Sequence, residues 1–378
     1  MEQDSLDSLL QHFEGLQDPR AARARRHELL DILVIAVCGV ICGADTWVDI
    51  AEFGLAKQEW FEQFLHLPNG IPSHDTFGRV FARLDPEQFQ GCFLAWAAAM
   101  REASGGKLVA LDGKTLRRSH DQARGQSALH LVSAWSTENH LVLGQQKVAG
   151  HSNEITALPA LLGMLALEGC TVTIDAMGTQ KEIAGRVREQ GADYVLALKG
   201  NQGRLYEEVQ DSFRLGHGEG FQGTAHDRYE SVNGGHGRIE RRRYWTIWDP
   251  EHIAYLDPGG EWAGLRSIGM VEAERRVGEK VTVERRYYLS SLCGQAREFA
   301  EAARGHWGIE NGLHWVLDVA FREDESRVRT GNAAENLALL RRIALNLLRQ
   351  EKTRKVGVKA QRLKAAWSED YLLKVLIS

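Results

Sequence analysis

The chain has 378 residues, which is enough for two or three domains. Its hydrophobic content of 43% and charged content of 26% are typical of a soluble globular protein. The net charge of −5 argues against a generally basic nucleic-acid-binding protein, because affinity for phosphates comes from clustered Lys and Arg. The five cysteines are too few and too scattered for a disulfide framework.

The N-terminal sequence favours a cytoplasmic location. MEQDSLDSLL has neither the basic n-region nor the apolar h-region of a secretory signal, so we expect none. The longest apolar run, 29–44, is shorter than a membrane span and carries Asp31, so it predicts a buried helix and no membrane partner. Cys38 and Cys42 share one face of this helix. No His or further Cys lies nearby, so we interpret them as core thiols rather than zinc ligands.

Residues 1–100 have the pattern of a helical domain, with polar residues at element starts and prolines in the later part. In 71–85, Ser73 is a plausible cap before a segment with one apolar face, formed by Phe77, Val80, Phe81 and Leu84. This segment could be the second helix of a DNA-binding helix-turn-helix or a plain core helix. Four arginines could track phosphates or mark a solvated helix start: Arg20, Arg23, Arg25 and Arg26.

From residue 107 the pattern changes to short strands that alternate with helices. The first three strand-like runs include a tight hairpin at ENH between the second and third. The predicted strands are 107–116, 129–137, 140–148, 170–177 and 192–200, and the predicted helices are 153–166, 179–191 and 201–214. This order predicts an α/β fold with a mixed sheet flanked by helices, in which the first and fourth strands lie side by side at the centre.

The next segment is rich in Gly, Arg and aromatic residues and predicts a β-rich insertion with strands at 238–248, 265–277 and 280–292. Helical periodicity returns at 295–321, and 333–350 is a strongly amphipathic helix. We therefore expect five segments: an N-terminal helical, DNA-binding domain (1–100), the first part of the core (105–215), the insertion (216–292), the second part of the core (293–350) and a basic tail (351–378).

Three acidic residues have the setting that a two-metal phosphodiester-cutting site needs. Asp112 lies within an apolar strand-like run, Asp175 ends another, and Glu310 lies in a later helix. Some of the 51 Asp and Glu residues will fall near strand ends by chance. Asp residues inside apolar runs are less ordinary, because a buried carboxylate is costly without a partner or a metal. Oxygen ligands suit Mg²⁺ or Mn²⁺ and can hold two ions that clamp the attacking and leaving oxygens.

His306, Glu310 and His314 are four residues apart, so a regular α-helix places them on one face. The HExxH spacing of a zinc protease is absent. We expect Glu310 to bind metal and the two histidines to contact DNA or to pack. Asp318, one step further along the helix, is the alternative ligand.

Basic and polar residues near these strand ends could hold phosphates, or could be solvated loop residues. They are Lys114 and Arg117 after Asp112, and Lys199, Asn201 and Gln202 after the fifth strand. The insertion adds Arg241, Arg242 and Arg243 beside aromatic residues, and 341–364 is a second basic stretch. The GKT at 113–115 lacks the earlier glycine of a P-loop, because Leu108 stands there, so we do not expect nucleotide binding.

Several long motifs resemble one family closely. LDGKTLRRS, SNEITALPALL, TIDAMGTQKEIA, GADYVLALKGNQGRL and HWGIENGLHWVLDVAFRED are similar to the H-repeat-associated (ISAs-type) transposases of bacterial insertion sequences, in the DDE superfamily. The resemblance is close over about 105–350. It implies an RNase H-like core, a β-rich insertion before the last acid, and Mg²⁺-dependent transposition with Asp112, Asp175 and Glu310 as the acids. Related transposases carry a Tyr-Arg-Glu-Lys signature, but Ala303, His306 and Leu317 occupy its other positions here, so a hairpin route is not implied.

The expected function is therefore a DNA transposase that frees a 3′-hydroxyl at an element end and joins it to target DNA. Its expected partners are double-stranded DNA, as terminal repeats and target, and a second copy in a synaptic homodimer near the nucleoid. Two rivals remain open: an inactive, transposase-derived DNA-binding protein, and a metal-dependent nuclease without strand transfer. The intact set of acids argues against the first rival, and only a product assay separates the second.

Overall fold

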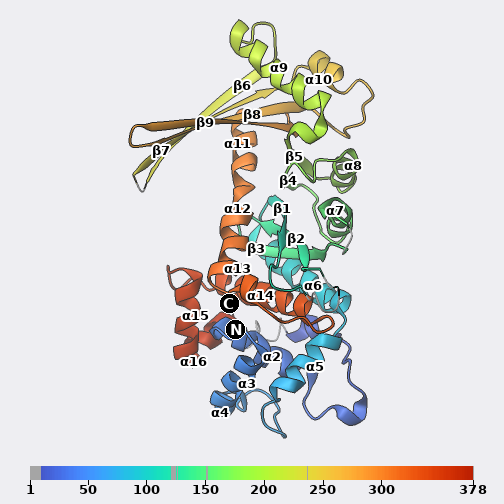
Figure 1. Cartoon of the computed structure of the whole chain (residues 1–378), viewed down its shortest axis with the longest axis vertical. Coiled ribbons are helices and arrows are strands. Elements are labelled where there is room, and N and C mark those ends of the chain that lie inside the picture. The colour runs from blue at the N-terminus through green and yellow to red at the C-terminus, as the bar shows by residue number, and fades with distance from the viewer. Residues whose placement is uncertain (1–9, 121–124, 126, 150–151, 236, 378) are drawn as a thin grey trace.

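One mixed sheet organises the molecule (Figure 1). The computed structural model describes residues 10–120, 125, 127–149, 152–235 and 237–377, so the extreme ends of the predicted first and last segments (1–9 and 378) lie outside it. Within these residues nine strands form the sheet in the order β3-β2-β1-β4-β5-β9-β8-β7-β6. The strands are β1 Leu108–Thr115, β2 His130–Ser136, β3 Leu141–Lys147, β4 Thr171–Ile174, β5 Asp193–Leu198, β6 His226–Gly235, β7 Arg238–Ile247, β8 Ser267–Val277 and β9 Lys280–Ser290.

The first five strands confirm the predicted alternation. β1, β2 and β3 are antiparallel neighbours, whereas β4 lies parallel to β1 and β5 lies parallel to β4. Helices α7 (Glu154–Gly163) and α8 (Lys181–Glu189) connect β3 to β4 and β4 to β5, and α9 (Arg204–Glu219) follows β5 after a short 3₁₀ turn, η3 (Gly200–Gln202). The mixed sheet flanked by helices is thus present, with β1 and β4 adjacent as expected.

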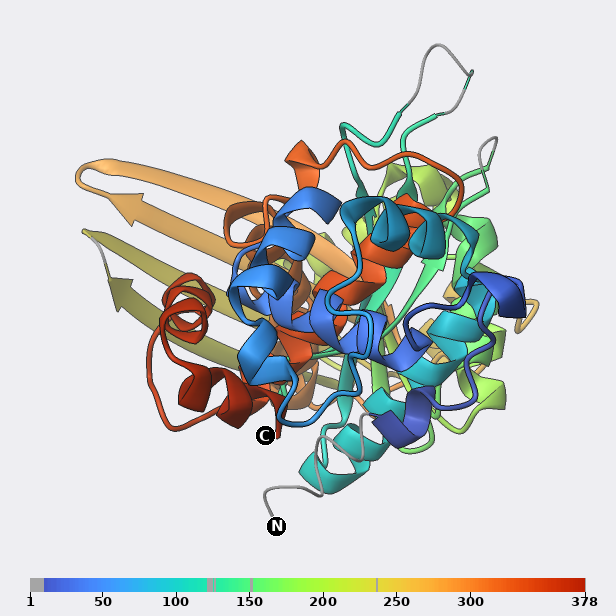
Figure 2. The same ribbon diagram turned by 90° about the horizontal axis from the view of Figure 1, so that it is seen from below.

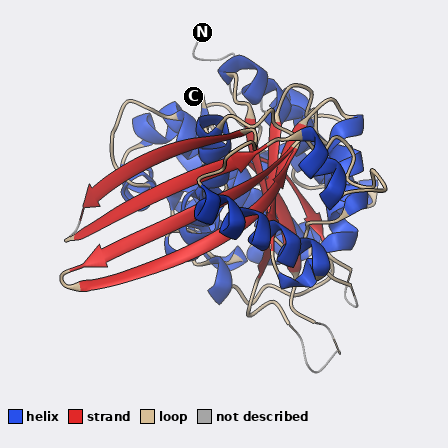
Figure 3. Ribbon diagram, turned by 90° about the horizontal axis from the view of Figure 1, so that it is seen from above, coloured by secondary structure: helices blue, strands red, loops and turns tan. Residues whose placement is uncertain are grey.

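The β-rich insertion continues the same sheet. Strand β9 pairs antiparallel with β5, and β8, β7 and β6 follow outward, with the short helix α10 (Pro250–Leu256) between β7 and β8. The four strands β6–β9, which we call the arm, project beyond the helices that cover the rest of the sheet (Figures 2 and 3). The sequence predicted strands here, but not that they would extend the central sheet.

The two faces of the arm have different surroundings. Successive side chains of a strand point to opposite faces. Arg242 and Tyr244 of β7 lie on the face covered by α11 (Ala296–Gly305), where Tyr244 packs edge-on against Phe299 with ring centroids 6.4 Å apart. Arg241 and Arg243 lie on the opposite face, which α9 covers near the body. The three consecutive arginines therefore do not form one surface.

Helices from both chain ends pack together at the other end of the molecule (Figure 1). They bury one shared hydrophobic core that also takes in Ala110, Trp135 and Val142 from the sheet. The N-terminal elements are η1 Ala22–Ala24, α2 Leu29–Cys42, α3 Trp47–Ala56, α4 Gln58–Phe61, α5 His74–Arg83 and α6 Pro86–Ser104, and the C-terminal helices are α14 Ala333–Gln350, α15 Val358–Trp367 and α16 Glu369–Leu376.

Segment 351–378 differs from the basic tail that the sequence predicts. Its residues form α15 and α16, which pack against α2. The reason is an apolar face, with Tyr371, Leu372, Val375 and Leu376 buried in the shared core. The basic side chains of the segment remain largely outside that face.

The predicted helices at 29–44 and 71–85 are present as α2 and α5. α2 is buried along most of its length, with Cys38 inside the core, and its cysteines are free thiols. Ser73 is the N-cap of α5, but its hydroxyl contacts the Thr76 hydroxyl at 3.1 Å and makes no capping bond to the backbone. Phe77, Val80 and Phe81 are buried, so this face of α5 is part of the hydrophobic core.

Among the described residues, no single helix is long and apolar enough to cross a membrane. Taken together, α2 and α3 are long and apolar enough for a membrane span, but the two helices meet at a bend of 97°.

A helical rod follows β9 and runs from the sheet toward the shared core (Figure 1). It comprises α11, α12 (Trp307–Ile309), a π-helical turn η4 (Glu310–His314) and α13 (Trp315–Val319), and a 3₁₀ turn η5 (Glu323–Glu325) comes next. The sequence predicted a continuous helix over 295–321 and did not predict the π turn. Single π turns inside α-helices occur frequently at functional sites.

Candidate active site

Asp112 and Asp175 are carried by neighbouring parallel strands. Leu111 of β1 pairs with Ile174 of β4. Asp112 is the next residue of β1, and Asp175 is the first residue after β4. Residues that are paired across two parallel neighbouring strands lie side by side, and so do the residues that follow them. The predicted adjacency of these strands therefore puts the two aspartates next to each other in the fold.

Asp175 begins a tight loop after β4. Its Oδ1 accepts hydrogen bonds from the backbone N–H of Met177 at 3.1 Å and of Gly178 at 3.2 Å. Burial raises the pKa of Asp175, and the negative charges of Glu154 and Asp112 raise it further, against the lowering effect of the Gly178 bond. Like charges close together are expected to destabilise the ionised form. A cation between these carboxylates would relieve that repulsion.

Asn201 and Gln202 support this loop. The Asn201 amide donates to the Ala176 carbonyl at 2.7 Å, and the Gln202 amide donates to the Thr179 carbonyl at 2.6 Å. Lys199, in contrast, is exposed. Of these three predicted DNA contacts, two are therefore engaged in shaping the loop that carries Asp175.

Glu310 lies in the π turn of the helical rod and is exposed. His306 lies four residues earlier on the same rod. Burial lowers the pKa of His306, and the charges of Asp112, Asp175 and Glu310 oppose that shift. Its Nδ1 lies 3.1 Å from the Thr173 hydroxyl of β4. His306 of the rod thus contacts β4 through Thr173 and lies within electrostatic range of the three acids.

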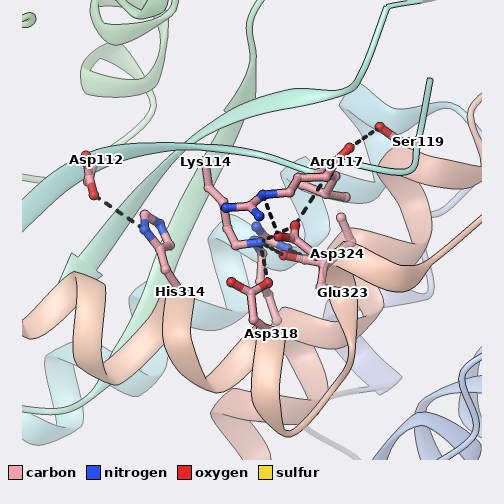
Figure 4. A network of polar contacts seen from close by, with 11 residues as sticks. Asp112, Lys114, Arg117, Ser119, His314, Asp318, Glu323 and Asp324 are labelled. Atoms are coloured by element: carbon pink, nitrogen blue, oxygen red, sulfur yellow. Dashed lines mark hydrogen bonds and ion pairs between the residues drawn. The ribbon is translucent and has the colours of Figure 1, made fainter.

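His314 reaches the same strand edge from the other end of the π turn. Its Nδ1 lies 3.4 Å from Asp112 Oδ2, as Figure 4 shows. Both predicted histidines therefore face the acids in this structure. Among the described residues, however, no group of three or more His, Cys, Asp or Glu side chains lies close enough together to hold a metal ion. Carboxylate oxygens suit Mg²⁺, but the three carboxylates do not lie close enough together in this structure to share an ion.

Glu154, at the start of α7, is an acid that the sequence did not single out. Its carboxylate fills the space where a side chain on Gly113 would lie, on the face of β1 opposite to the Asp112 side chain, and its charge helps to raise the pKa of Asp175. His130 Nε2 lies 2.9 Å from Glu154 Oε1. Glu154 does lie in one of the family-like motifs, SNEITALPALL. Nothing in that motif indicates that the start of this helix contacts β1.

Lys114, two residues after Asp112, is buried within a network of carboxylates (Figure 4). Its ammonium lies 2.6 Å from Asp318, 3.0 Å from Asp324 and 3.6 Å from Glu323. Arg117 pairs with Asp324 at 3.2 Å but is largely exposed. Asp318, the alternative metal ligand in the sequence, is therefore occupied by Lys114.

A groove of about 740 Å³ separates the arm from the helical rod. Arg286 lies over the ring of Trp307, 4.3 Å from its centroid. Among the described residues, neither Arg242 Nη1 nor Arg349 Nε has a hydrogen-bond partner, although both atoms are buried. The basic and aromatic residues that line the groove include Arg242, Arg275, Arg286, Arg304, Trp307 and Arg349. Three acids also line it, and two of them form ion pairs there, Glu240 with Arg242 and Glu284 with Arg286. Unpaired guanidinium N–H groups in a groove are suited to anionic oxygens.

The other predicted arginines of the arm lie outside this groove. Arg241 pairs with Glu230 at 3.3 Å. Arg243 pairs with Glu272 at 2.8 Å and with Glu274 at 3.3 Å. Cross-strand ion pairs thus neutralise much of the charge on that face.

Comparison with known proteins finds a family to which the whole chain is similar. Residues 103–347 match the family model described as "Transposase DDE domain", and residues 10–97 match the model described as "DDE_Tnp_1-associated". The chain is 42% identical over 377 residues to "Putative transposase YncI" of Escherichia coli O157:H7, which covers 99% of this chain and 95% of that protein. It is 40% identical to "H repeat-associated putative transposase YhhI" of Escherichia coli strain K12, over 98% of both chains.

Among solved structures, the chain is similar to piggyBac transposase in a synaptic complex with hairpin DNA, with a TM-score of 0.43 and 9% identity, covering 98% of this chain and 78% of that one. The family matches extend over most of the described residues, and both named relatives align along nearly their full length. The chain belongs to the DDE transposase family, with an N-terminal DDE-associated region, as its motifs had indicated.

Proposed function

We propose that this chain is a Mg²⁺-dependent DNA transposase with its reacting centre at Asp112, Asp175 and Glu310. The observation that supports the proposal is that three elements, β1, β4 and the helical rod, meet beside the two aspartates. Parallel strands β1 and β4 present the two aspartates together. The rod that carries Glu310 contacts the same edge through His314 and Asp112.

The strand order β3-β2-β1-β4-β5, with three antiparallel strands and then two parallel ones, supports an RNase H-like core over 105–215 and 293–350. The arm, at 216–292, is the insertion before the last acid. Segments 1–100 and 351–378 pack around α14 and are proposed to act as one helical unit.

Asp112, Asp175 and Glu310 would hold Mg²⁺, or Mn²⁺, through carboxylate oxygens alone, the donors that these cations prefer. When bound, two such ions stabilise the attacking and leaving oxygens of a phosphodiester displacement. Because Glu310 is exposed, its side chain has room to turn toward the aspartates. Burial keeps Asp175 in a setting where a neighbouring positive charge is favourable.

The proposed reaction has two displacements. In cleavage, a water oxygen attacks phosphorus at an element end, the P–O3′ bond breaks, and the leaving 3′ oxygen takes a proton. In strand transfer, that 3′-hydroxyl loses its proton and attacks a target phosphorus, the P–O3′ bond of the target strand breaks, and the leaving 3′ oxygen takes a proton. The chain contributes positioning and charge stabilisation rather than a covalent nucleophile.

The proposed path of double-stranded DNA includes the groove between the arm and the rod. Its guanidinium groups would bind backbone phosphates, and an element end in the groove would lie beside Glu310, because Trp307, Gly308 and Asn311 of the rod line it. We further propose that two copies act together at a pair of element ends.

The direct test is to incubate the full chain with labelled duplexes of its element's terminal repeats, target DNA and Mg²⁺. Nicked and joined products are the expected result. Nicks without joined products would identify a nuclease, and binding without nicks would identify an inactive DNA-binding protein. Scrambled duplexes are the control for end recognition.

A second experiment tests the DNA path with a matched pair of variants. Arg242→Gln is expected to weaken binding to end duplexes several-fold and to lower the salt slope of log affinity by about 0.9, because one phosphate contact is lost. Arg241→Gln, on the opposite face of the same strand, should leave both quantities unchanged. Affinity is measured by fluorescence anisotropy at several salt concentrations. An equal loss in both variants would move the DNA away from this groove.

A further inference from the structure

A pair of polar contacts fixes the helical rod along strand β1. His314 meets Asp112 at 3.4 Å, and Asp318 meets Lys114 at 2.6 Å. Asp112 and Lys114 are two residues apart, so they point to the same side of the strand and are spaced by about 6.7 Å. His314 and Asp318 are four residues apart, a spacing of about 6 Å along a helix. The two spacings match, so the rod lies in register with the strand.

The Lys114 ammonium is the stronger of these anchors. Its side chain is 8% exposed, and the carboxylates of Asp318, Asp324 and Glu323 surround it. Burial lowers the pKa of Lys114, but the charges of Glu323, Asp318 and Asp324 outweigh burial and leave the pKa above its usual value. The group therefore stays protonated and pairs with all three acids.

The surrounding charges leave Lys114 little freedom to bind another anion. Glu323 also pairs with Arg342 at 2.9 Å, and both of those side chains are fully buried. Asp324 also pairs with Arg117, whose side chain is 83% exposed. The ion pairs of this cluster thus match the carboxylates of Asp318, Glu323 and Asp324 with the cations of Lys114, Arg117 and Arg342, and the charge of Arg341 also acts on Glu323. If Lys114 turned toward a phosphate, it would leave buried negative charge behind, which is costly.

We propose that Lys114 is a positioning residue, which holds the Glu310 rod against β1 through Asp318 and thereby sets the distance between Glu310 and the aspartates. This inference rests on the proposed function for its effect on catalysis, but the anchoring itself does not. Displacement of a reacting group by about 1 Å can lower a rate roughly 10²-fold, so a distant anchor of this kind has a large effect.

The test compares Lys114→Met with the conservative variant Lys114→Arg and with Lys147→Met. Lys147 forms an ion pair with Glu335 at 3.3 Å on the edge strand β3, away from the rod, and serves as the matched control. Lys114→Met is expected to lower kcat for end cleavage roughly 10- to 100-fold with KM for the duplex within about threefold, since the anchor positions a ligand and does not bind DNA. Lys114→Arg should recover part of the loss, and Lys147→Met should match the wild type.

Amide hydrogen exchange in residues 307–320 provides a readout that does not depend on activity. Loss of the anchor is expected to speed exchange there about tenfold in Lys114→Met but not in Lys147→Met. Asp318→Asn, which keeps the side-chain shape, should do the same and covers the case in which Lys114→Met does not fold. Unchanged exchange in both variants would overturn the inference. A raised KM with normal kcat and normal exchange would make Lys114 a phosphate contact.

These readouts separate the inference from the proposed function. A wild-type chain that does not cleave any end duplex contradicts the proposed function. In that case the exchange rates of residues 307–320 still decide whether Lys114 holds the rod.

Discussion

Asp112→Asn is expected to lower the rate of end cleavage roughly 10³-fold while the affinity for end duplexes changes less than about threefold. The amide keeps the size of the side chain but loses the negative charge that a divalent cation needs. Asp112 accepts the backbone N–H of Gly113 at 3.0 Å, and an amide oxygen can keep that bond, so the fold should persist. The measurements are single-turnover cleavage with Mg²⁺ and anisotropy with the same duplex.

The control for this variant is Asp211→Asn, which removes an exposed acid of α9 that pairs with Arg214. It should leave cleavage and binding at wild-type values. Glu310→Gln should behave like Asp112→Asn if Glu310 completes the site. Loss of duplex binding in step with cleavage would instead assign these acids a structural role, and a normal rate in Glu310→Gln would remove Glu310 from the site.

Arg342→Met is expected to destabilise the folded chain by about 3–5 kcal/mol. Arg342 and Glu323 are both fully buried, and Arg342 also donates to the Ala338 carbonyl at 2.8 Å. Removing the guanidinium leaves Lys114, at 3.6 Å, as the remaining ion-pair partner of the Glu323 carboxylate among the described residues, with the more distant charge of Arg341 also acting on it. Chemical denaturation followed by circular dichroism measures the change.

The double variant Arg342→Met with Glu323→Leu is the informative companion. Because replacing both members of a buried pair by apolar residues is often neutral, it should recover most of the lost stability. A double variant as unstable as Arg342→Met alone would show that packing around Arg342, and not its charge pairing, stabilises this region. Arg214→Met, which removes an exposed partner of Asp211, should change stability by less than about 1 kcal/mol.

The order of strands in the core could be predicted because each strand is a short apolar run with clear ends. Alternation of such runs with helices leaves few possible topologies. Asp112 and Asp175 could be singled out in the same way, since a carboxylate inside or directly after an apolar run is unusual. The predicted positions of β1 and β4 follow from these local patterns.

The partners of charged residues could not be predicted, because they lie far away along the chain. Lys114 had the appearance of a phosphate contact, yet its nearest carboxylate belongs to Asp318, 204 residues later. Glu154 packs against β1 only because Gly113 leaves space for it. The π turn at Glu310–His314 has no signature in residue spacing, so the sequence predicted a regular helix.

The packing of α2 against α14 and α15 has a consequence for synthesis of the chain. α2 is the most apolar helix of the described residues, and although it also contacts α3, its partners α14 and α15 lie about 300 residues later. At about 5–20 residues per second, a ribosome needs roughly 15–60 s to produce them. During that time the nascent chain carries α2 without the surface that buries it, which favours chaperone binding. A polypeptide terminated before α14 lacks a large part of the surface that buries this helix and is expected to aggregate or be degraded.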